Sequence, residues 1–205
     1  MVELQLRMRG IDDARVLRAF AAVPRDEFVP DELRDRAYED TPLAIGHRQT
    51  ISQPYVVAVA AELLALAGDE RVLDVGTGSG YAAAILAKLA REVHTIERIP
   101  ALADAARARL ARLGYDNVHV HCGDGTEGWP EAAPYDAIAV AASAPRPPRP
   151  LLDQLAIGGR LVLPVGDERM QRLVLVTRTS ELVYDQQDRG AVRFVPLVGA
   201  HGWPP

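Results

Sequence analysis

The sequence has almost no cysteine, since Cys122 is the only one among its 205 residues. A single thiol excludes an internal disulfide and suits the reducing cytoplasm, which is the location we expect. Long apolar runs are also missing, so we expect no transmembrane helix and no membrane partner. The amino terminus lacks the apolar stretch and small-residue cleavage site of a signal peptide.

Positive charge is scarcer than negative charge: 23 Lys and Arg stand against 28 Asp and Glu, which gives a net charge of −5. Nucleic-acid-binding proteins usually present a basic face, so the composition predicts no nucleic-acid partner, although a local basic strip would escape this argument. The five histidines show no metal-ligand spacing with cysteine or carboxylates, so we expect no metal. His119 and His121 alternate on a predicted strand and share a face, which we interpret as structural.

Apolar segments and helical patterns alternate along most of the chain, which has the 48% hydrophobic content of an ordinary globular protein. We predict strands at 71–75, 93–97, 118–121, 135–140 and 160–165 and helices at 12–22, 31–38, 54–66, 79–90, 100–113 and 150–155. Residues 39–53 are predicted to form a loop or short strand, and runs 173–177 and 192–198 an antiparallel strand pair at a sheet edge. The fold class is therefore α/β: a doubly wound, mostly parallel sheet with an N-terminal helical cap.

A glycine-rich turn follows the first predicted strand of this sheet. Asp74 ends the strand, and Gly76, Gly78 and Gly80 lead into a helix, so a ligand can approach the backbone closely. A dinucleotide fingerprint would need glycine at position 81, where Tyr81 stands. A dinucleotide or phosphate site and a turn without ligand remain alternatives. The spacing resembles motif I of the class I S-adenosylmethionine-dependent methyltransferases, which have a Rossmann-like fold.

Two further acids follow neighbouring strands, where ligands bind in parallel sheets. Glu97 ends the second strand and is predicted to accept hydrogen bonds from both ribose hydroxyls, or else is a solvated helix-cap acid. Asp124 stands between two glycines and is predicted to contact the adenine amino group, or else forms a plain Asp-Gly turn. The small residues of 141–145 leave room for a substrate, or form an ordinary linker.

Two signatures of base-methylating enzymes are missing. Cys122 lacks the preceding proline of a cytosine C5 methylase nucleophile, and the chain has no Asn/Asp-Pro-Pro-Tyr/Phe motif. Motifs upstream of motif I point to another substrate. The chain closely resembles the protein-L-isoaspartate (D-aspartate) O-methyltransferases over residues 12–199, most specifically at Thr50-Ile51-Ser52-Gln53-Pro54. Other matching segments are 23–30, 37–40, 42–46, 74–81, 97–99, 123–125, 134–138, 158–166 and 193–198.

The resemblance implies a role for each matching residue. Ser52 is the expected active-site serine, and residues 46–50 form part of a lid over cofactor and substrate, in which Gly46, Gln49 and Thr50 are expected to bind the cofactor. Gly76, Thr77 and Gly78 are expected to contact the methionine part of the cofactor, Glu97 its ribose, and Asp124 with Gly125 its adenine. Asp74 and Arg98 are also expected to bind the cofactor. His47 and Arg48 depart from the family, which usually has an aromatic residue and then a small or polar one.

The resemblance also implies an activity. The expected enzyme transfers a methyl group from S-adenosylmethionine to the free α-carboxylate of L-isoaspartyl residues in damaged proteins and peptides, with S-adenosylhomocysteine as product. The methyl ester converts through a succinimide towards normal aspartyl, so the implied function is protein repair. We predict one methyltransferase domain, with residues 1–53 as cap and lid, 54–166 as cofactor-binding core and 167–205 as C-terminal strands.

Three alternatives remain open. Ser52 is predicted to orient the substrate carboxylate as a hydrogen-bond donor, but it also suits the N-cap of the helix that starts at Pro54. A relative that methylates a dedicated peptide would be expected to carry long accessory domains, and the 205 residues show none. A regulatory protein that binds the cofactor without catalysis is disfavoured by the intact Ser52, Glu97 and Asp124.

Overall fold

The main sheet of the computed structural model, which describes residues 1–167 and 169–204, has seven strands in the order β5-β4-β3-β6-β7-β8-β9. Its strands are β3 (Arg71–Val75), β4 (Glu92–Glu97), β5 (Val118–Cys122), β6 (Tyr135–Val140), β7 (Leu155–Gly166), β8 (Gln171–Arg178) and β9 (Tyr184–Val192). Strands β3 to β7 pair in parallel, and β8 and β9 add antiparallel partners. The predicted doubly wound α/β class is confirmed.

Strand β3 lies at the point where the strand order reverses, because it pairs with β4 on one side and with β6 on the other. Its residues Val72, Leu73 and Val75 are almost fully buried, as expected for a central strand covered on both faces. Ligands of open α/β sheets bind beyond the carboxyl ends of the strands at such a reversal. The fold therefore places a binding site beside the end of β3.

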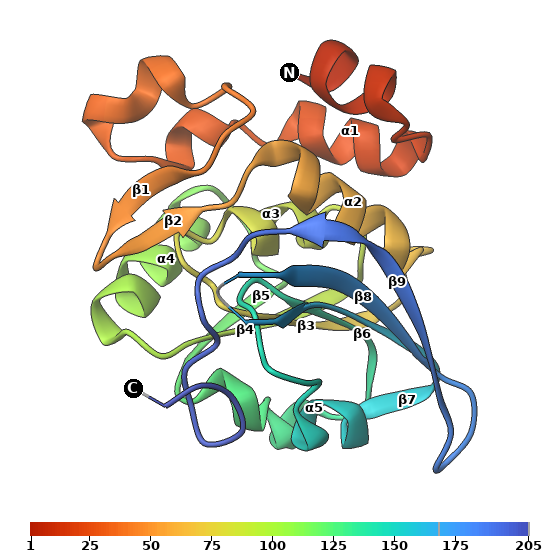
Figure 1. Ribbon diagram of the computed structural model, residues 1–205. Coiled ribbons are helices and arrows are strands. Elements are labelled where there is room, and N and C mark those ends of the chain that lie inside the picture. Colours follow the sequence, from red (N-terminus) through yellow and green to blue (C-terminus); the bar gives the residue numbers. More distant parts are fainter. Residues whose placement is uncertain (168, 205) are drawn as a thin grey trace.

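Helices cover both faces of this sheet (Figure 1). They are α1 (Ala14–Ala22), α2 (Pro54–Leu64), α3 (Tyr81–Ala87), α4 (Pro100–Arg112) and α5 (Arg149–Asp153). Buried residues of α1 to α4 form one apolar cluster with the sheet, and Leu151 of α5 belongs to a second cluster on the other face. Proline at the first turn of α2 and of α4 suits the helix start, where its missing N–H has no intrahelical partner. Among the described residues, none of the helices is both long enough and apolar enough to span a membrane.

The last part of the chain differs from the prediction. Strand β9 ends at Val192, so the strand predicted at 192–198 is wrong. The residues of β9 are mostly polar and exposed, because it forms the sheet edge and is held by its backbone pairing with β8. The apolar residues after Val192 instead border the cavity described below. The predicted region 167–205 includes positions 168 and 205, which lie outside the described residues.

The amino-terminal cap also differs in detail. The helix predicted at 31–38 is a run of 3₁₀ turns over Asp31–Arg36, and short helical turns at Val2–Leu6 and Arg7–Arg9 precede α1. Tyr81, which replaces the third glycine of a dinucleotide fingerprint, is 2% exposed. Its ring packs edge-on against Phe20 and Phe28. Position 81 therefore anchors the cap to the sheet domain.

Residues 39–53, predicted as a loop or short strand, contain a hairpin of β1 (Leu43–Gly46) and β2 (Gln49–Ile51). The two turn residues, His47 and Arg48, have φ of 51° and 58°. Two positive φ angles in a two-residue hairpin loop are those of a type I′ turn, which favours Asn-Gly. Side chains other than Gly, Asn and Asp are strained there, so the hairpin stores backbone strain within the predicted lid.

We expect the double substitution of His47→Asn and Arg48→Gly to raise the free energy of unfolding by about 1–2 kcal/mol, because it relieves this strain. Urea denaturation followed by circular dichroism measures the change. The matched control is His47→Ala with Arg48→Ala, which also removes both side chains but keeps a Cβ at each position. Equal stabilisation by both pairs would show that backbone strain is not the cause.

Candidate active site

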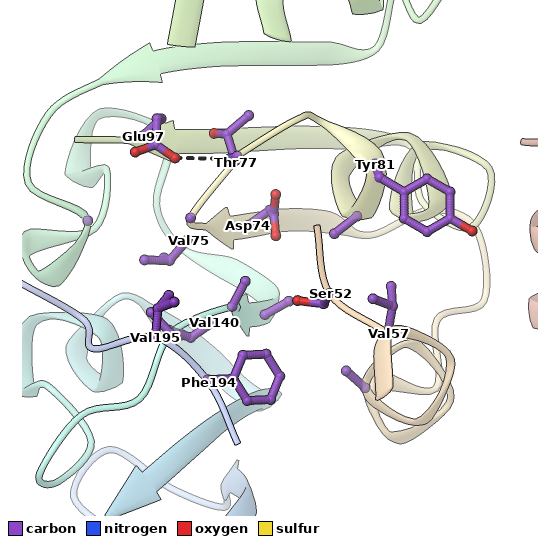
Figure 2. A pocket seen from close by; sticks show the side chains of 18 of the residues that line it. Ser52, Val57, Asp74, Val75, Thr77, Tyr81, Glu97, Val140, Phe194 and Val195 are labelled. Atoms are coloured by element: carbon purple, nitrogen blue, oxygen red, sulfur yellow. Dashed lines mark hydrogen bonds between the residues drawn. The ribbon is translucent and has the colours of Figure 1, made fainter. Parts of the chain in front are cut away.

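A cavity opens beyond the carboxyl ends of β3, β4 and β6, where the strand order reverses (Figure 2). Its wall combines the end of β2, one side of α2, the motif I turn and the segment after β9. The predicted site residues that line it are Gln49, Thr50, Ser52, Asp74, Gly76, Thr77, Gly78, Glu97, Arg98 and Gly125. Gly46 and Asp124 are not among the lining residues. The predicted site is thus assembled largely at one place.

The motif I turn packs against the next strand. The backbone N–H groups of Gly76 and Thr77 both donate to the carbonyl oxygen of Ile96, at 2.9 and 3.3 Å. Gly76 and Gly78 have φ of 97° and 52°, which glycine adopts without strain. The turn is therefore fixed to β4 by its own backbone and borders the cavity with little side-chain bulk.

Glu97 joins the motif I turn to the start of α4. Its side-chain oxygens Oε2 and Oε1 accept hydrogen bonds from the N–H groups of Gly78 and Ile99, at 2.9 and 3.0 Å. The residue is 5% exposed, so the alternative of a solvated acid is wrong. Each carboxylate oxygen can accept a second hydrogen bond, which leaves one acceptor position on each for a ligand.

Asp74 is buried at the base of the cavity and is 1% exposed. Its Oδ2 accepts a hydrogen bond of 2.8 Å from the Thr95 hydroxyl, whereas Oδ1 has no partner among the described residues. Burial raises the pKa of Asp74 to about 7; the Thr95 hydrogen bond opposes this rise and the charge of Glu97 adds to it. A buried oxygen without a partner is costly, so this carboxyl group is suited to a ligand that donates hydrogen bonds or carries positive charge.

Ser52 lies just before α2, with its side chain near Asp74, Val140 and Phe194 (Figure 2). The alternative that it caps α2 is wrong, because the N-cap residue is Gln53. Asp40 instead supports the helix start: its Oδ1 accepts the N–H of Tyr55 at 3.1 Å. The Ser52 hydroxyl is therefore not committed to the role of helix cap.

Arg25 holds the backbone at Ser52 and was not predicted as a site residue. It is 0% exposed, and its guanidinium donates to the carbonyl oxygens of Ser52 at 2.9 Å and Ala37 at 2.7 Å. The same guanidinium lies 4.8 Å from the centre of the Tyr81 ring. Desolvation by burial lowers the pKa of Arg25 from its ordinary value. A buried arginine thus links the serine loop to the cap, and its position in the 23–30 motif was the available sequence signal.

Asp124 has local hydrogen-bond partners. Its Oδ1 accepts from the N–H and the hydroxyl of Thr126, and its Oδ2 accepts from the N–H of Ala200 at 2.7 Å. These contacts match the alternative of a turn residue, while Gly125 beside it lines the cavity. The contact of Asp124 with adenine stays a prediction, and so does the lid role of Gly46 at the end of β1.

The comparisons with known proteins agree with this geometry. The family model for protein-L-isoaspartate(D-aspartate) O-methyltransferase matches residues 1–202. The chain belongs to this family. It is 62% identical over 205 residues to protein-L-isoaspartate O-methyltransferase 2 of Marinobacter nauticus, covering 100% of this chain and 94% of that protein. The predicted family is therefore confirmed.

Two solved structures share the whole fold. One, described as a protein-L-isoaspartate O-methyltransferase, has a TM-score of 0.87 and 30% identity, and the match covers 98% of this chain and 67% of that one. The other is described as this enzyme from Plasmodium falciparum in complex with S-adenosyl-L-homocysteine. Its TM-score is 0.80 at 30% identity, and the match covers 96% of both chains. The enzyme is an S-adenosylmethionine-dependent methyltransferase that repairs isoaspartyl residues, and the predicted activity and cofactor are confirmed.

Proposed function

We propose that this enzyme methylates isoaspartyl peptides in the cavity at the end of β3, with Ser52 as the residue that orients the substrate carboxylate. The observation that carries this proposal is the meeting of Ser52, Asp74 and Glu97 around one cavity. These residues come from three separate segments of the chain: Asp74 and Glu97 lie on the paired strands β3 and β4, and Ser52 lies between β2 and α2.

The hydrogen-bond acceptors and negative charges of the cavity complement the positive charge and the hydroxyl groups of S-adenosylmethionine. The unpartnered Oδ1 of Asp74 provides an acceptor where the cofactor carries positive charge, and Glu97 keeps free acceptor positions for ribose hydroxyls. The motif I turn leaves space beside its backbone, and Gly125 adds a wall without a side chain. We assign the methionine part to Asp74 and the turn at 76–78, the ribose to Glu97 with Arg98, and the adenine to the side of Gly125.

The chain itself has little chemistry to perform. When bound, the cofactor supplies an electrophilic methyl group. The α-carboxylate of an isoaspartyl residue is already ionised at neutral pH, so no general base is required. Ser52 donates a hydrogen bond to one carboxylate oxygen and fixes the direction of the other, while the apolar residues Val140 and Phe194 exclude water. The Arg25 guanidinium keeps this serine in place by donating a hydrogen bond to the backbone carbonyl oxygen of Ser52.

Substrate selectivity is the direct test of this proposal. We expect the labelled methyl group of S-adenosylmethionine to be transferred to an isoaspartyl peptide and not to the peptide of the same sequence with a normal aspartyl residue. Only the isoaspartyl residue has a free α-carboxylate, because its side-chain carboxyl group forms the peptide bond. Scintillation counting of both peptides and of tRNA under the same conditions measures this. Equal labelling of the two peptides, or labelling of tRNA alone, would contradict the proposal.

The raised pKa of Asp74 leads to an expected pH dependence. A cationic cofactor binds the ionised carboxyl group better than the neutral one, so affinity for S-adenosylmethionine should increase as the pH rises through about 7. We expect roughly five- to tenfold weaker binding at pH 6 than at pH 7.5, measured by calorimetry. Asp74→Asn cannot ionise and should give weaker binding that no longer changes over this interval. If the affinity of Asp74→Asn for S-adenosylmethionine still changes with pH over this interval, another group causes the pH dependence.

The proposed partners are isoaspartyl-containing proteins and peptides, without nucleic acid or membrane. The proposed location is the cytoplasm, where the exposed thiol of Cys122 stays reduced. Fractionation of the source cells with an antibody against the enzyme tests the location, and recovery outside the cytoplasmic fraction would contradict it.

A further inference from the structure

Three side chains that commonly ligate metals meet where β5 forms the edge of the sheet. Glu92 and His94 alternate on β4, and His119 of β5 is paired in register with His94. One ring nitrogen of each histidine and one oxygen of Glu92 all lie within 4.8 Å of one another. None of the three residues lines the cofactor cavity.

The two distances from Glu92 to the histidines match those of a tetrahedral metal site. Oε1 of Glu92 lies 3.2 Å from Nε2 of His94 and 3.5 Å from Nε2 of His119. Metal–ligand bonds of about 2.0–2.1 Å at tetrahedral angles place ligand atoms about 3.3–3.4 Å apart. An ion bound by all three atoms keeps the two distances to Glu92 nearly unchanged, and it requires the histidine nitrogens, which lie within 4.8 Å of each other, to stand at a similar separation.

Neighbouring side chains hold the ligands in this orientation. Nε of Arg71 donates to Oε2 of Glu92 at 2.9 Å, which leaves Oε1 directed at the histidines. Nδ1 of His94 lies 3.0 Å from Nε2 of His121, and the His121 ring stacks on Trp129 at 4.0 Å. With a metal on Nε2, His94 carries its proton on Nδ1 and donates it to His121. Such outer hydrogen bonds fix the tautomer of metal-ligating histidines.

The structure assigns to Glu92, His94 and His119 a binding site for one divalent transition-metal ion such as Zn²⁺. Two imidazoles and one carboxylate suit Zn²⁺ and its neighbours better than Mg²⁺ or Ca²⁺, and they leave a fourth position for water. The ion joins the edge strand β5 to β4 outside the methyl-transfer cavity. The expectation of no metal considered spacing along the chain, whereas these ligands come from two paired strands.

The test uses tag-free enzyme and ZnCl₂ alone. Calorimetry should give one ion per chain. Saturation at about 100 times the dissociation constant should raise the Tm by about 5–10 °C. Co²⁺ in place of Zn²⁺ should give the visible absorption of a cobalt ion with imidazole and carboxylate ligands. A wild-type enzyme that binds neither ion would overturn the assignment and show that the cluster is only a hydrogen-bond network.

Variants locate the ion. Glu92→Gln and His119→Ala should each weaken Zn²⁺ binding more than about tenfold, and His121→Phe by about 10- to 100-fold through the lost support of His94. The His119 side chain is 46% exposed, so its removal leaves the core intact. Cys122→Ser and His201→Ala are the matched controls and should bind like the wild type. Full binding by both ligand variants, or loss of binding in Cys122→Ser, would overturn the assignment.

Discussion

Ser52→Ala is expected to lower kcat/KM on an isoaspartyl peptide about 100-fold, because the hydroxyl that aligns the attacking carboxylate is lost. The fold should remain, since Ser52 does not cap α2 and its hydrogen bond from Arg25 uses the backbone carbonyl, which alanine keeps. Binding of S-adenosylhomocysteine should also remain, because Asp74, Glu97 and the motif I turn are untouched. Steady-state kinetics and calorimetry measure the two effects separately.

Two further serine variants test the kind of role. Ser52→Thr keeps a hydroxyl at the same position and should restore part of the lost activity. Ser52→Cys should form no methylated or acylated enzyme during turnover, because the proposed reaction has no covalent intermediate. If Ser52→Ala keeps the full kcat/KM, Ser52 does not orient the substrate. A covalent adduct at position 52 detected by mass spectrometry would show that the proposed mechanism is wrong.

The central part of the fold could be predicted from sequence because its signals are local. The limits of β3 and β6 agree with the predicted strands at 71–75 and 135–140, since buried parallel strands form continuous apolar runs between turn residues. The motif I turn is indicated by the spacing of its glycines between a predicted strand, which Asp74 ends, and a predicted helix. Such signals depend on neighbours in the chain and are independent of tertiary contacts.

The structure at the edges of the sheet depends on which strands pair and in which register, and the sequence alone does not show this. Strand β9 is polar and exposed, so it lacks the alternation of a half-buried strand, and its backbone pairing with β8 decides its structure. The apolar residues after it resemble a strand but border the cavity instead. His119 likewise meets Glu92 only through the register of β4 and β5. The role of Arg25 is similar, because burial and the position of the Ser52 carbonyl oxygen appear only in the folded chain.

Glu97→Ala is expected to weaken binding of S-adenosylhomocysteine about 10- to 150-fold, which corresponds to about 1.5–3 kcal/mol for lost hydrogen bonds to a charged group. The substitution removes the proposed ribose acceptor and also leaves the N–H groups of Gly78 and Ile99 without their carboxylate. Glu127→Ala, which changes an exposed acid that does not line the cavity, is the control and should bind normally. Calorimetry of both folded variants measures the difference.

The two consequences of losing Glu97 can be separated with a cofactor analogue. S-adenosylhomocysteine without its ribose 2′-hydroxyl should bind the wild-type enzyme more weakly than the intact molecule, because one acceptor position of Glu97 loses its donor. In Glu97→Ala the two molecules should bind alike, since the carboxylate that distinguishes them is gone; the coupling between the two changes measures the ribose contact itself. If the 2′-deoxy analogue keeps its full disadvantage in Glu97→Ala, another group binds the ribose, and Glu97 acts only by holding the motif I turn through Gly78.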